Sequence, residues 1–249
     1  MEKYRGKFLP ESSYEGTDDG PDFRKYAYGS QPEGHAAFAA MVHTIDDYVG
    51  EITARLKELG IDDNTLIIFT SDNGPHQEAG HDPAYFNSNG SMRGFKRDLY
   101  EGGINVPMIA RWPGKVAAGT ETDLISAFWD VMPTVAEMAK VDAPTDIDGI
   151  SFLPTLLNRD GQKQHDYLYW EFHEKKGRVA IRKGNWKGVR YNVSIDAHSP
   201  LELYDLSADP QEQYNIAMQH PDVVAELDLL MKNARTESPV KRYNFPSRR

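Results

Sequence analysis

One apolar run that ends in a group of oxygen-bearing side chains constrains the fold of this chain more than any other stretch. Residues 65–70 are Thr-Leu-Ile-Ile-Phe-Thr, and Ser71-Asp-Asn-Gly74 follows them directly. Because β-branched and aromatic residues favour strands, this run predicts a buried strand. Ligands of open α/β sheets bind beyond the carboxyl ends of the strands. Asp72 and Asn73 therefore stand where a cation or substrate would be met, although Asp-Asn-Gly-Pro is also ordinary turn chemistry.

A long polar loop follows this turn. Residues 78–94 are rich in glycine, side-chain amides and charged groups. A loop of this length inside a compact domain is usually functional. Residues that select a substrate tend to lie on such loops, which makes His76 the first candidate for substrate contact. The weaker candidates on the same loop are Glu78, His81 and Asp82.

Several motifs on and after this loop resemble those of one known family. They are Ser71-Asp-Asn-Gly74, Arg93-Gly-Phe-Lys96, Tyr100-Glu-Gly-Gly-Ile-Asn-Val-Pro107, Arg111-Trp-Pro-Gly114 and Glu202-Leu-Tyr-Asp-Leu206, with Asp209-Pro210 and Asn215 further on. In order and spacing they resemble the arylsulfatase-like sulfatases of the alkaline-phosphatase superfamily. The resemblance covers the C-terminal half of the family fold only.

The resemblance implies sulfuric ester hydrolysis, with a sulfated carbohydrate as the expected substrate. It assigns Asp72 and Asn73 as metal ligands, whose hard oxygens suit Ca²⁺, the usual ion of the family, or Mg²⁺. Because calcium takes about six to eight oxygens, two ligands make only part of a site. The resemblance also assigns Lys96 as the catalytic lysine that contacts the sulfate and offsets charge as the S–O bond breaks. His76 joins Lys96 as an expected substrate contact.

The chain departs from the family at the nucleophile. Sulfatases use a formylglycine made from Cys or Ser within a Cys/Ser-x-Pro-x-Arg motif, and these 249 residues contain no cysteine and no such motif. The near match Asn244-Phe-Pro-Ser-Arg248 has Asn at the nucleophile position and lies in the wrong place for the fold. We therefore expect the chain to be inactive alone and to have the missing N-terminal half of the sulfatase fold as its partner.

Two other functions stay open at this stage. A nucleophile-less protein that binds sulfated glycans would keep the lysine and the loop. Another hydrolase of the alkaline-phosphatase superfamily, such as a phosphatase or phosphotransferase, would normally bring two metals and more His and Asp ligands than Asp72 and Asn73 supply. An in-frame Cys/Ser-x-Pro-x-Arg motif in the coding sequence upstream would favour the sulfatase.

The apolar patterns predict an α/β fold. The resemblance implies more specifically an incomplete sulfatase-like α/β sandwich that contains the second half of the main sheet. Apolar residues three and four apart predict an amphipathic helix over residues 35–59, with its apolar face on that sheet. Residues 106–111 predict a second strand. We expect residues 1–160 to form this C-terminal portion of the α/β core.

A smaller C-terminal α+β subdomain is expected over residues 161–249. Its aromatic and β-branched runs at 167–172, 178–183 and 186–191 predict an antiparallel sheet. Gly184-Asn185 suits a two-residue hairpin turn between the last two runs. A helix over residues 221–235 would cover one face of this sheet. Trp170, Glu171 and His173 could then form a wall of the substrate pocket.

The charge balance limits the classes of partner. A formal net charge of −10 argues against nucleic-acid binding, which needs a basic stripe to displace counterions from phosphates. No apolar run approaches the length of a membrane span, and the first residues lack the hydrophobic centre of a signal peptide. Sulfatases are often periplasmic, secreted or lysosomal, and the sequence leaves the compartment undetermined.

Overall fold

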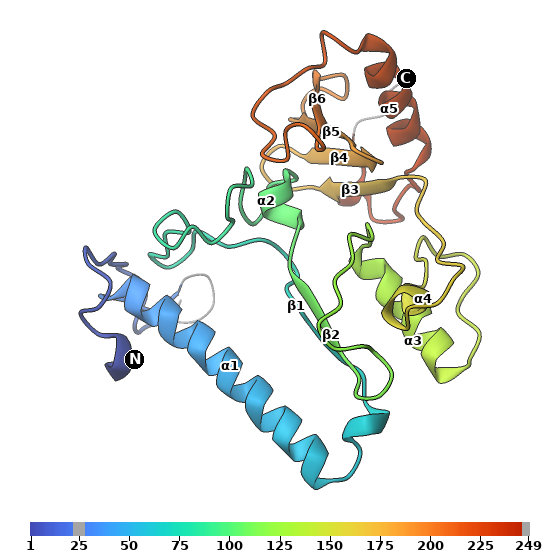
Figure 1. Ribbon diagram of the computed structural model, residues 1–249. Helices are drawn as coiled ribbons and strands as arrows, with labels where there is room; N and C mark the ends of the chain where they lie inside the picture. Colours follow the sequence, from blue (N-terminus) through green and yellow to red (C-terminus); the bar gives the residue numbers. More distant parts are fainter. Residues whose placement is uncertain (22–27, 246–249) are drawn as a thin grey trace.

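The computed structural model describes residues 1–21 and 28–245, and it combines helices with two antiparallel sheets (Figure 1). The near match to the formylglycine motif extends into residues 246–248, which lie outside the described residues. The longer elements are α1 (Gly34–Glu58), β1 (Ile67–Thr70), α2 (Glu101–Ile104), β2 (Met108–Arg111), α3 (Val131–Ala139), α4 (Leu153–Leu156), β3 (Leu168–Phe172), β4 (Arg178–Lys183), β5 (Trp186–Tyr191), β6 (Leu201–Asp205) and α5 (Pro221–Asn233).

Four strands of the C-terminal part form one antiparallel sheet in the order β3-β4-β5-β6. The expected hairpin joins β4 to β5, because Lys183 pairs with Trp186 and leaves a two-residue turn between them. Gly184 of this turn has a φ of +58°, a left-handed value that glycine adopts without strain. The sequence-based prediction of a separate antiparallel sheet is confirmed.

This sheet buries apolar side chains on both faces. Successive residues of a strand point to opposite faces. On one face a cluster packs against α5, and its members include Val179, Ile181, Leu203, Leu227 and Met231. On the other face the sheet packs against residues just before α2, in a cluster of Leu99, Tyr100, Ala180, Val189 and Tyr204. Figure 1 shows α2 directly beside this sheet. The residues around α2 are therefore held by the small sheet.

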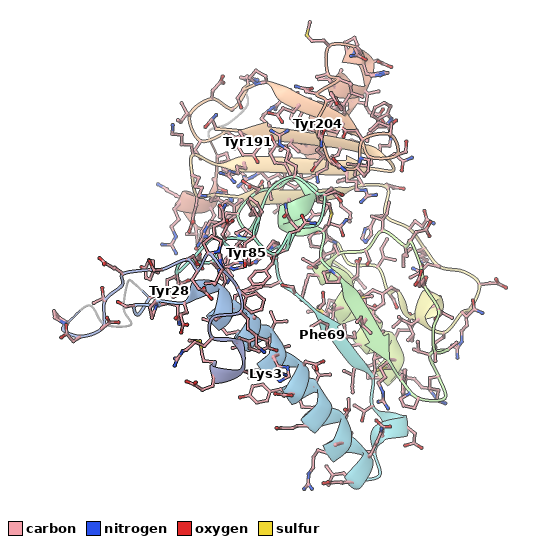
Figure 2. The ribbon with its side chains drawn as sticks, turned by 60° about the vertical axis from the view of Figure 1, so that its left-hand side comes forward. Lys3, Tyr28, Phe69, Tyr85, Tyr191 and Tyr204 are labelled. Carbon is pink, nitrogen blue, oxygen red and sulfur yellow. The ribbon has the colours of Figure 1, made fainter. Side chains whose placement is uncertain are left out.

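The predicted strands at 65–70 and 106–111 lie in one sheet, as expected. β1 and β2 pair antiparallel, with Ile67 opposite Arg111 and Thr70 opposite Met108. Within the described residues, β1 has β2 as its strand partner and the sheet has two strands. Phe69 and Ile109 are exposed, and Figure 2 marks Phe69 on β1. Two-stranded ladders are marginal in water, so this ladder depends on what packs around it.

The predicted packing of the long helix on this sheet is wrong. The apolar side of α1 is open to solvent, because five of its residues and the residue that caps its C-terminus are exposed: Met41, Val42, Ile45, Tyr48, Ile52 and the cap Leu59. Figure 1 shows α1 alongside the two strands and connected to them at one end, through the turn at Asp62–Asn64. The 3.6-residue period identified the helix correctly, but it does not say which surface covers the apolar face. None of the helices in the described parts of the chain is long and apolar enough to cross a lipid bilayer.

Candidate active site

The turn after β1 is fixed by short hydrogen bonds. Ser71 Oγ donates to the carbonyl of Asn73 at 2.8 Å, and Asn73 Nδ2 donates to the carbonyl of Gly74 at 2.8 Å. The second bond uses the amide nitrogen, so the amide oxygen of Asn73 is the atom left for a cation. Asp72 is exposed at the tip of the turn.

The polar loop returns to this turn and brings Lys96 with it. The backbone N–H of Lys96 donates to the carbonyl of Pro75 at 2.8 Å, and that of Gly74 donates to the carbonyl of Gly103 at 2.9 Å. The two bonds join the tip of β1 to both ends of the segment 96–103. Lys96 thus lies beside the turn although it is 24 positions after Asp72 in the sequence.

The glycines of this segment allow a close approach of two chain segments and do not serve a left-handed backbone. Gly74, Gly102 and Gly103 are buried, and none of them has a positive φ. A Cβ on Gly74 would overlap the carbonyl of Gly102, and a Cβ on Gly102 would overlap the carbonyls of Gly94 and Arg93. The chain segments touch backbone to backbone here, which only glycine permits.

The small sheet holds the same segment through buried charges. Arg178 on β4 donates from Nη1 to the carbonyl of Arg97 and to Asp98 Oδ1, both at 2.5 Å. Lys187 on β5 is fully buried, and its Nζ lies 2.5 Å from Glu101 Oε1. The backbone N–H of Glu101 donates to Glu212 Oε2 at 2.6 Å. These contacts join the return segment, residues 96–103, to residues eighty or more positions further along the chain.

Burial and charge set the protonation of this buried group. Burial raises the pKa of Glu212 to about 7, although the nearby Lys187 ammonium acts in the opposite direction. Burial also opposes ionisation of Glu101, but Lys187 and Arg182 outweigh it and hold the pKa of Glu101 below its usual value. Of the two carboxylates that face Lys187, Glu101 is therefore the one that stays ionised at neutral pH.

Two motifs that are far apart in the sequence meet at a tyrosine pair. The hydroxyls of Tyr100 and Tyr204 both donate to Glu202 Oε2 at 2.6 Å. Burial, together with this hydrogen bond, raises the pKa of both hydroxyls. The guanidinium of Arg93 lies 3.9 Å from the centre of the Tyr100 ring and donates to the Tyr204 hydroxyl. Figure 2 marks Tyr204 on the small sheet.

Asp72, Asn73 and Lys96 all line one open cavity of about 950 Å³. Arg97 and Glu101 line it as well, next to Lys96. The small sheet contributes aromatic and basic side chains to the same wall, and these are Trp170, Phe172 and Arg182. The cavity thus combines oxygen atoms from the turn after β1, cations from the segment 96–103 and an aromatic surface from β3.

His76, the other expected substrate contact, is absent from the lining of this cavity. Its Nδ1 accepts the backbone N–H of Glu78 at 3.1 Å, and its ring lies 5.1 Å from that of His81. Burial lowers the pKa of His76, and it lowers the pKa of His81, which stacks on Phe38, to about 4. These two histidines belong to an aromatic cluster under the loop.

Asp82, Glu171 and His173 have partners within the protein and are absent from the lining of the cavity. Asp82 Oδ1 accepts the backbone N–H of Ala84 at 2.9 Å, in turn geometry. Glu171 alternates with Trp170 on β3 and pairs with Arg235 at 2.6 Å and with His173 at 2.9 Å. Sequence reasoning did not identify Arg178, Lys187 or Glu212, because no local motif marks a partner so distant along the chain.

The donor chemistry of the turn fits a hard cation in part. Asp72 and Asn73 offer oxygens to the cavity, as Ca²⁺ or Mg²⁺ require. In residues 1–21 and 28–245, no three His, Asp or Glu side chains form a set that could hold a metal ion. The two residues therefore fit as members of a larger ligand set.

Comparisons with known proteins agree with this geometry. The sequence profile described as Sulfatase matches residues 6–141, and that of N-sulphoglucosamine sulphohydrolase, C-terminal, matches residues 92–237. The chain belongs to the sulfatase family. Its α/β architecture matches part of the alkaline-phosphatase-like fold of the solved sulfatase structures.

Individual relatives place the chain within that family. The N-acetylgalactosamine-6-O-sulfatase of Bacteroides thetaiotaomicron is 36% identical over an alignment 212 residues long, gaps included, and the match covers 77% of this chain and 40% of that protein. The steryl-sulfatase of Rattus norvegicus is 32% identical over 227 residues, covering 78% of this chain and 39% of the relative. The chain thus spans about two fifths of the length of these sulfatases.

Solved structures give the same picture. One, in complex with its substrate D-glucosamine-2-N,6-O-disulfate, superposes with a TM-score of 0.63 at 28% identity, over 81% of this chain and 39% of that one. The phosphonate monoester hydrolase of Agrobacterium radiobacter superposes with a TM-score of 0.59 at 26% identity, over 80% of this chain and 41% of that one. Membership of the sulfatase family implies a metal ion and a formylglycine in the complete enzyme.

Proposed function

We propose that this chain is the C-terminal portion of a sulfuric ester hydrolase that acts on sulfated carbohydrates. The observation that carries this proposal is the cavity that Asp72, Asn73 and Lys96 line together. Relatives named as hexosamine sulfatases, and the neighbouring structure in complex with a sulfated glucosamine, support a sugar sulfate as substrate. Residues 1–160 would form the C-terminal part of the α/β core, and residues 161–249 the small subdomain that buttresses it.

In this proposal each side chain has a separate task. Asp72 and the amide oxygen of Asn73 supply two ligands of a Ca²⁺ site, with Mg²⁺ as the alternative ion. Such a cation, when bound, would polarise a sulfate oxygen. Lys96 donates hydrogen bonds to the sulfate and offsets the negative charge that develops on its oxygens. Trp170 and Phe172 offer an aromatic surface beside the site, on which a sugar ring can lie.

The nucleophile does not come from these residues. No Cys/Ser-x-Pro-x-Arg segment, from which a formylglycine could be made, occurs in the 249 residues. The exposed apolar side of α1 and the two-stranded ladder of β1 and β2 support a further proposal, that the rest of a sulfatase fold covers them. Burying apolar surface of this kind contributes roughly 25 cal/mol per Å². The catalytic unit would then be complete only with that first part.

A chimera tests this function. The segment of the Bacteroides thetaiotaomicron N-acetylgalactosamine-6-O-sulfatase that matches this chain is replaced by residues 1–249, so that the relative supplies the first part. We expect the chimera to hydrolyse sulfated hexosamines and the isolated chain to hydrolyse none. A folded chimera that contains the family nucleophile but has no sulfatase activity would contradict the proposal.

Two alternatives give different outcomes in the same experiment. A sulfated-glycan-binding protein without a nucleophile would leave the chimera inactive, while the isolated chain would bind sulfated oligosaccharides in calorimetry. The likeness to a phosphonate monoester hydrolase makes phosphate and phosphonate esters the second substrate panel. Faster hydrolysis of those esters than of sulfates would favour another hydrolase of the superfamily.

A further inference from the structure

Glu78 lies at the centre of a group of hydrogen bonds and ion pairs beside the cavity. Its carboxylate is 17% exposed and faces three groups from two distant segments. Oε2 accepts the hydroxyl of Tyr28 at 2.5 Å and lies 3.5 Å from Lys96 Nζ, and Oε1 lies 2.5 Å from Arg97 Nη2. Lys96 and Arg97 line the cavity, whereas Glu78 and Tyr28 lie outside its lining.

The charges in this group explain why the carboxylate is needed. Lys96 and Arg97 are adjacent cations at the cavity wall, and like charges at short range repel. The hydrogen bond from Tyr28 and the pairing with Arg97 lower the pKa of Glu78 to about 2, so its carboxylate is ionised at any working pH. An ammonium has three donors, so one directed at Glu78 leaves two for a ligand.

The backbone at the same place is also held in an uncommon conformation. Arg97 has a φ of +80°, a value that few residues other than glycine adopt. Arg178 stabilises this backbone by donating to the Arg97 carbonyl. Strained residues held by their surroundings are common at functional sites. Arg178 thus fixes the main chain at this point, and Glu78 fixes the side chains.

We propose that Glu78 is a positioning residue, whose carboxylate holds the Lys96 ammonium and the Arg97 guanidinium at the cavity wall. Lys96 has a flexible four-carbon stem, and without Glu78 it would spend less time where a sulfate ester binds. Glu78 acts through Lys96 and does not touch the substrate. The inference rests on the proposed function, because Lys96 is assigned to the sulfate there.

A double-mutant cycle in the chimera separates positioning from a structural role. We expect Glu78→Gln to lower kcat about tenfold with KM changed less than twofold, since the loss falls on an interaction made in the transition state. In a Lys96→Ala background the same change should cost less than about twofold, because Glu78 then has no lysine to hold. Equal losses in both backgrounds would overturn the proposal.

Glu226→Gln is the matched control. Glu226 pairs with Lys183 at an exposed position and does not line the cavity, so this change removes the same charge without a contact to Lys96. We expect its kcat to match that of the parent chimera. A Glu226→Gln loss as large as that of Glu78→Gln would show that general charge, and not the Glu78 contact, matters.

A second measurement uses the chain itself and needs no activity. His76 reports on Glu78: burial lowers its pKa, the Glu78 carboxylate raises it, and Lys96 and Arg97 lower it. His81 is the other titratable ring beside it. In an NMR titration of residues 1–249, Glu78→Gln should therefore lower the pKa of His76 further. A rise toward the ordinary histidine value would mean that the loop had opened, and an unchanged value would mean that the carboxylate does not face this group; either overturns the inference. An inactive parent chimera would count against the proposed function, and this titration would still decide the role of Glu78.

Discussion

Single residues of the return segment are fixed by space as much as by charge. A glycine pair such as Gly102-Gly103 can serve either a left-handed backbone or a close approach of two chain segments. The structure shows that their carbonyl neighbours leave no room for a Cβ. A one-letter sequence cannot distinguish these reasons, because both select glycine.

Gly102→Ala should therefore destabilise the chain. Its Cβ would overlap backbone carbonyls that cannot move independently, and overpacking of this kind costs about 1–3 kcal/mol. Denaturant unfolding of residues 1–249 measures the loss. Gly50→Ala is the control, because Gly50 lies in α1 with open space around its Cβ, and that change should stabilise by roughly 0.5–1 kcal/mol. Equal stability of the two variants would refute the crowding argument.

The buried Glu212 gives a pH dependence with a defined sign. Its pKa in the folded chain is raised to about 7, so the folded state binds a proton more tightly than the unfolded state does. Its contribution to stability is fully present below the ordinary carboxylate pKa and is lost as pH rises through about 7. The effect should be about 1–3 kcal/mol between pH 4.5 and 7.5.

Glu212→Gln isolates that contribution. The free energy of unfolding, measured at several pH values, should change less with pH in this variant than in the parent over that range. Subtracting the two curves removes the contribution of His81 to the pH dependence. Because the pKa of His81 is lowered to about 4, its contribution to stability is lost as pH falls, whereas that of Glu212 is lost as pH rises. Parallel curves for the parent and the variant would contradict the assignment of this titration to Glu212.

At the scale of elements, local sequence patterns correctly predicted those helices and turns that depend on neighbouring residues alone. The hairpin at Gly184-Asn185 and the helix α5 follow from turn chemistry and apolar period, and both occur. The packing of α1 was predicted wrongly, because periodicity identifies an apolar face without identifying its partner. The same limit applies to Arg178 and Glu212, whose partners lie far back in the chain, at residues 97–101.

The exposed face of α1 provides an element-scale prediction. Ile45→Glu should leave the folding of residues 1–249 nearly unchanged, since Ile45 is already 49% exposed. In the chimera it should lower the yield of folded, active protein, because a charge would be buried without a partner. Ala54→Glu places the same charge on the opposite side of the helix and should be tolerated. Full activity of the Ile45→Glu chimera would mean that this face stays open in the complete enzyme.

At the scale of the whole molecule, the site depends on two bodies of structure that meet at residues 93–105. β1 delivers Asp72 and Asn73, and the polar loop returns Lys96 to them. The small sheet clamps that return segment through Lys187 and Arg178, with its own core behind it. The sequence motifs predicted that Asp72, Asn73 and Lys96 come together, because each of these residues lies in a local motif. The clamp depends on contacts between residues eighty or more positions apart, which no motif encodes.

The most direct test of this account is the turnover of the chimera with and without the Lys96 ammonium. Removing one group that stabilises transition-state charge typically costs about 10²–10³ in kcat, so Lys96→Ala should lower kcat by about that factor and leave KM within a few-fold. Lys115→Ala, at an exposed lysine away from the cavity, should leave both constants unchanged. Equal kcat values for the Lys96→Ala and Lys115→Ala chimeras would contradict the claim that this chain supplies a catalytic cation.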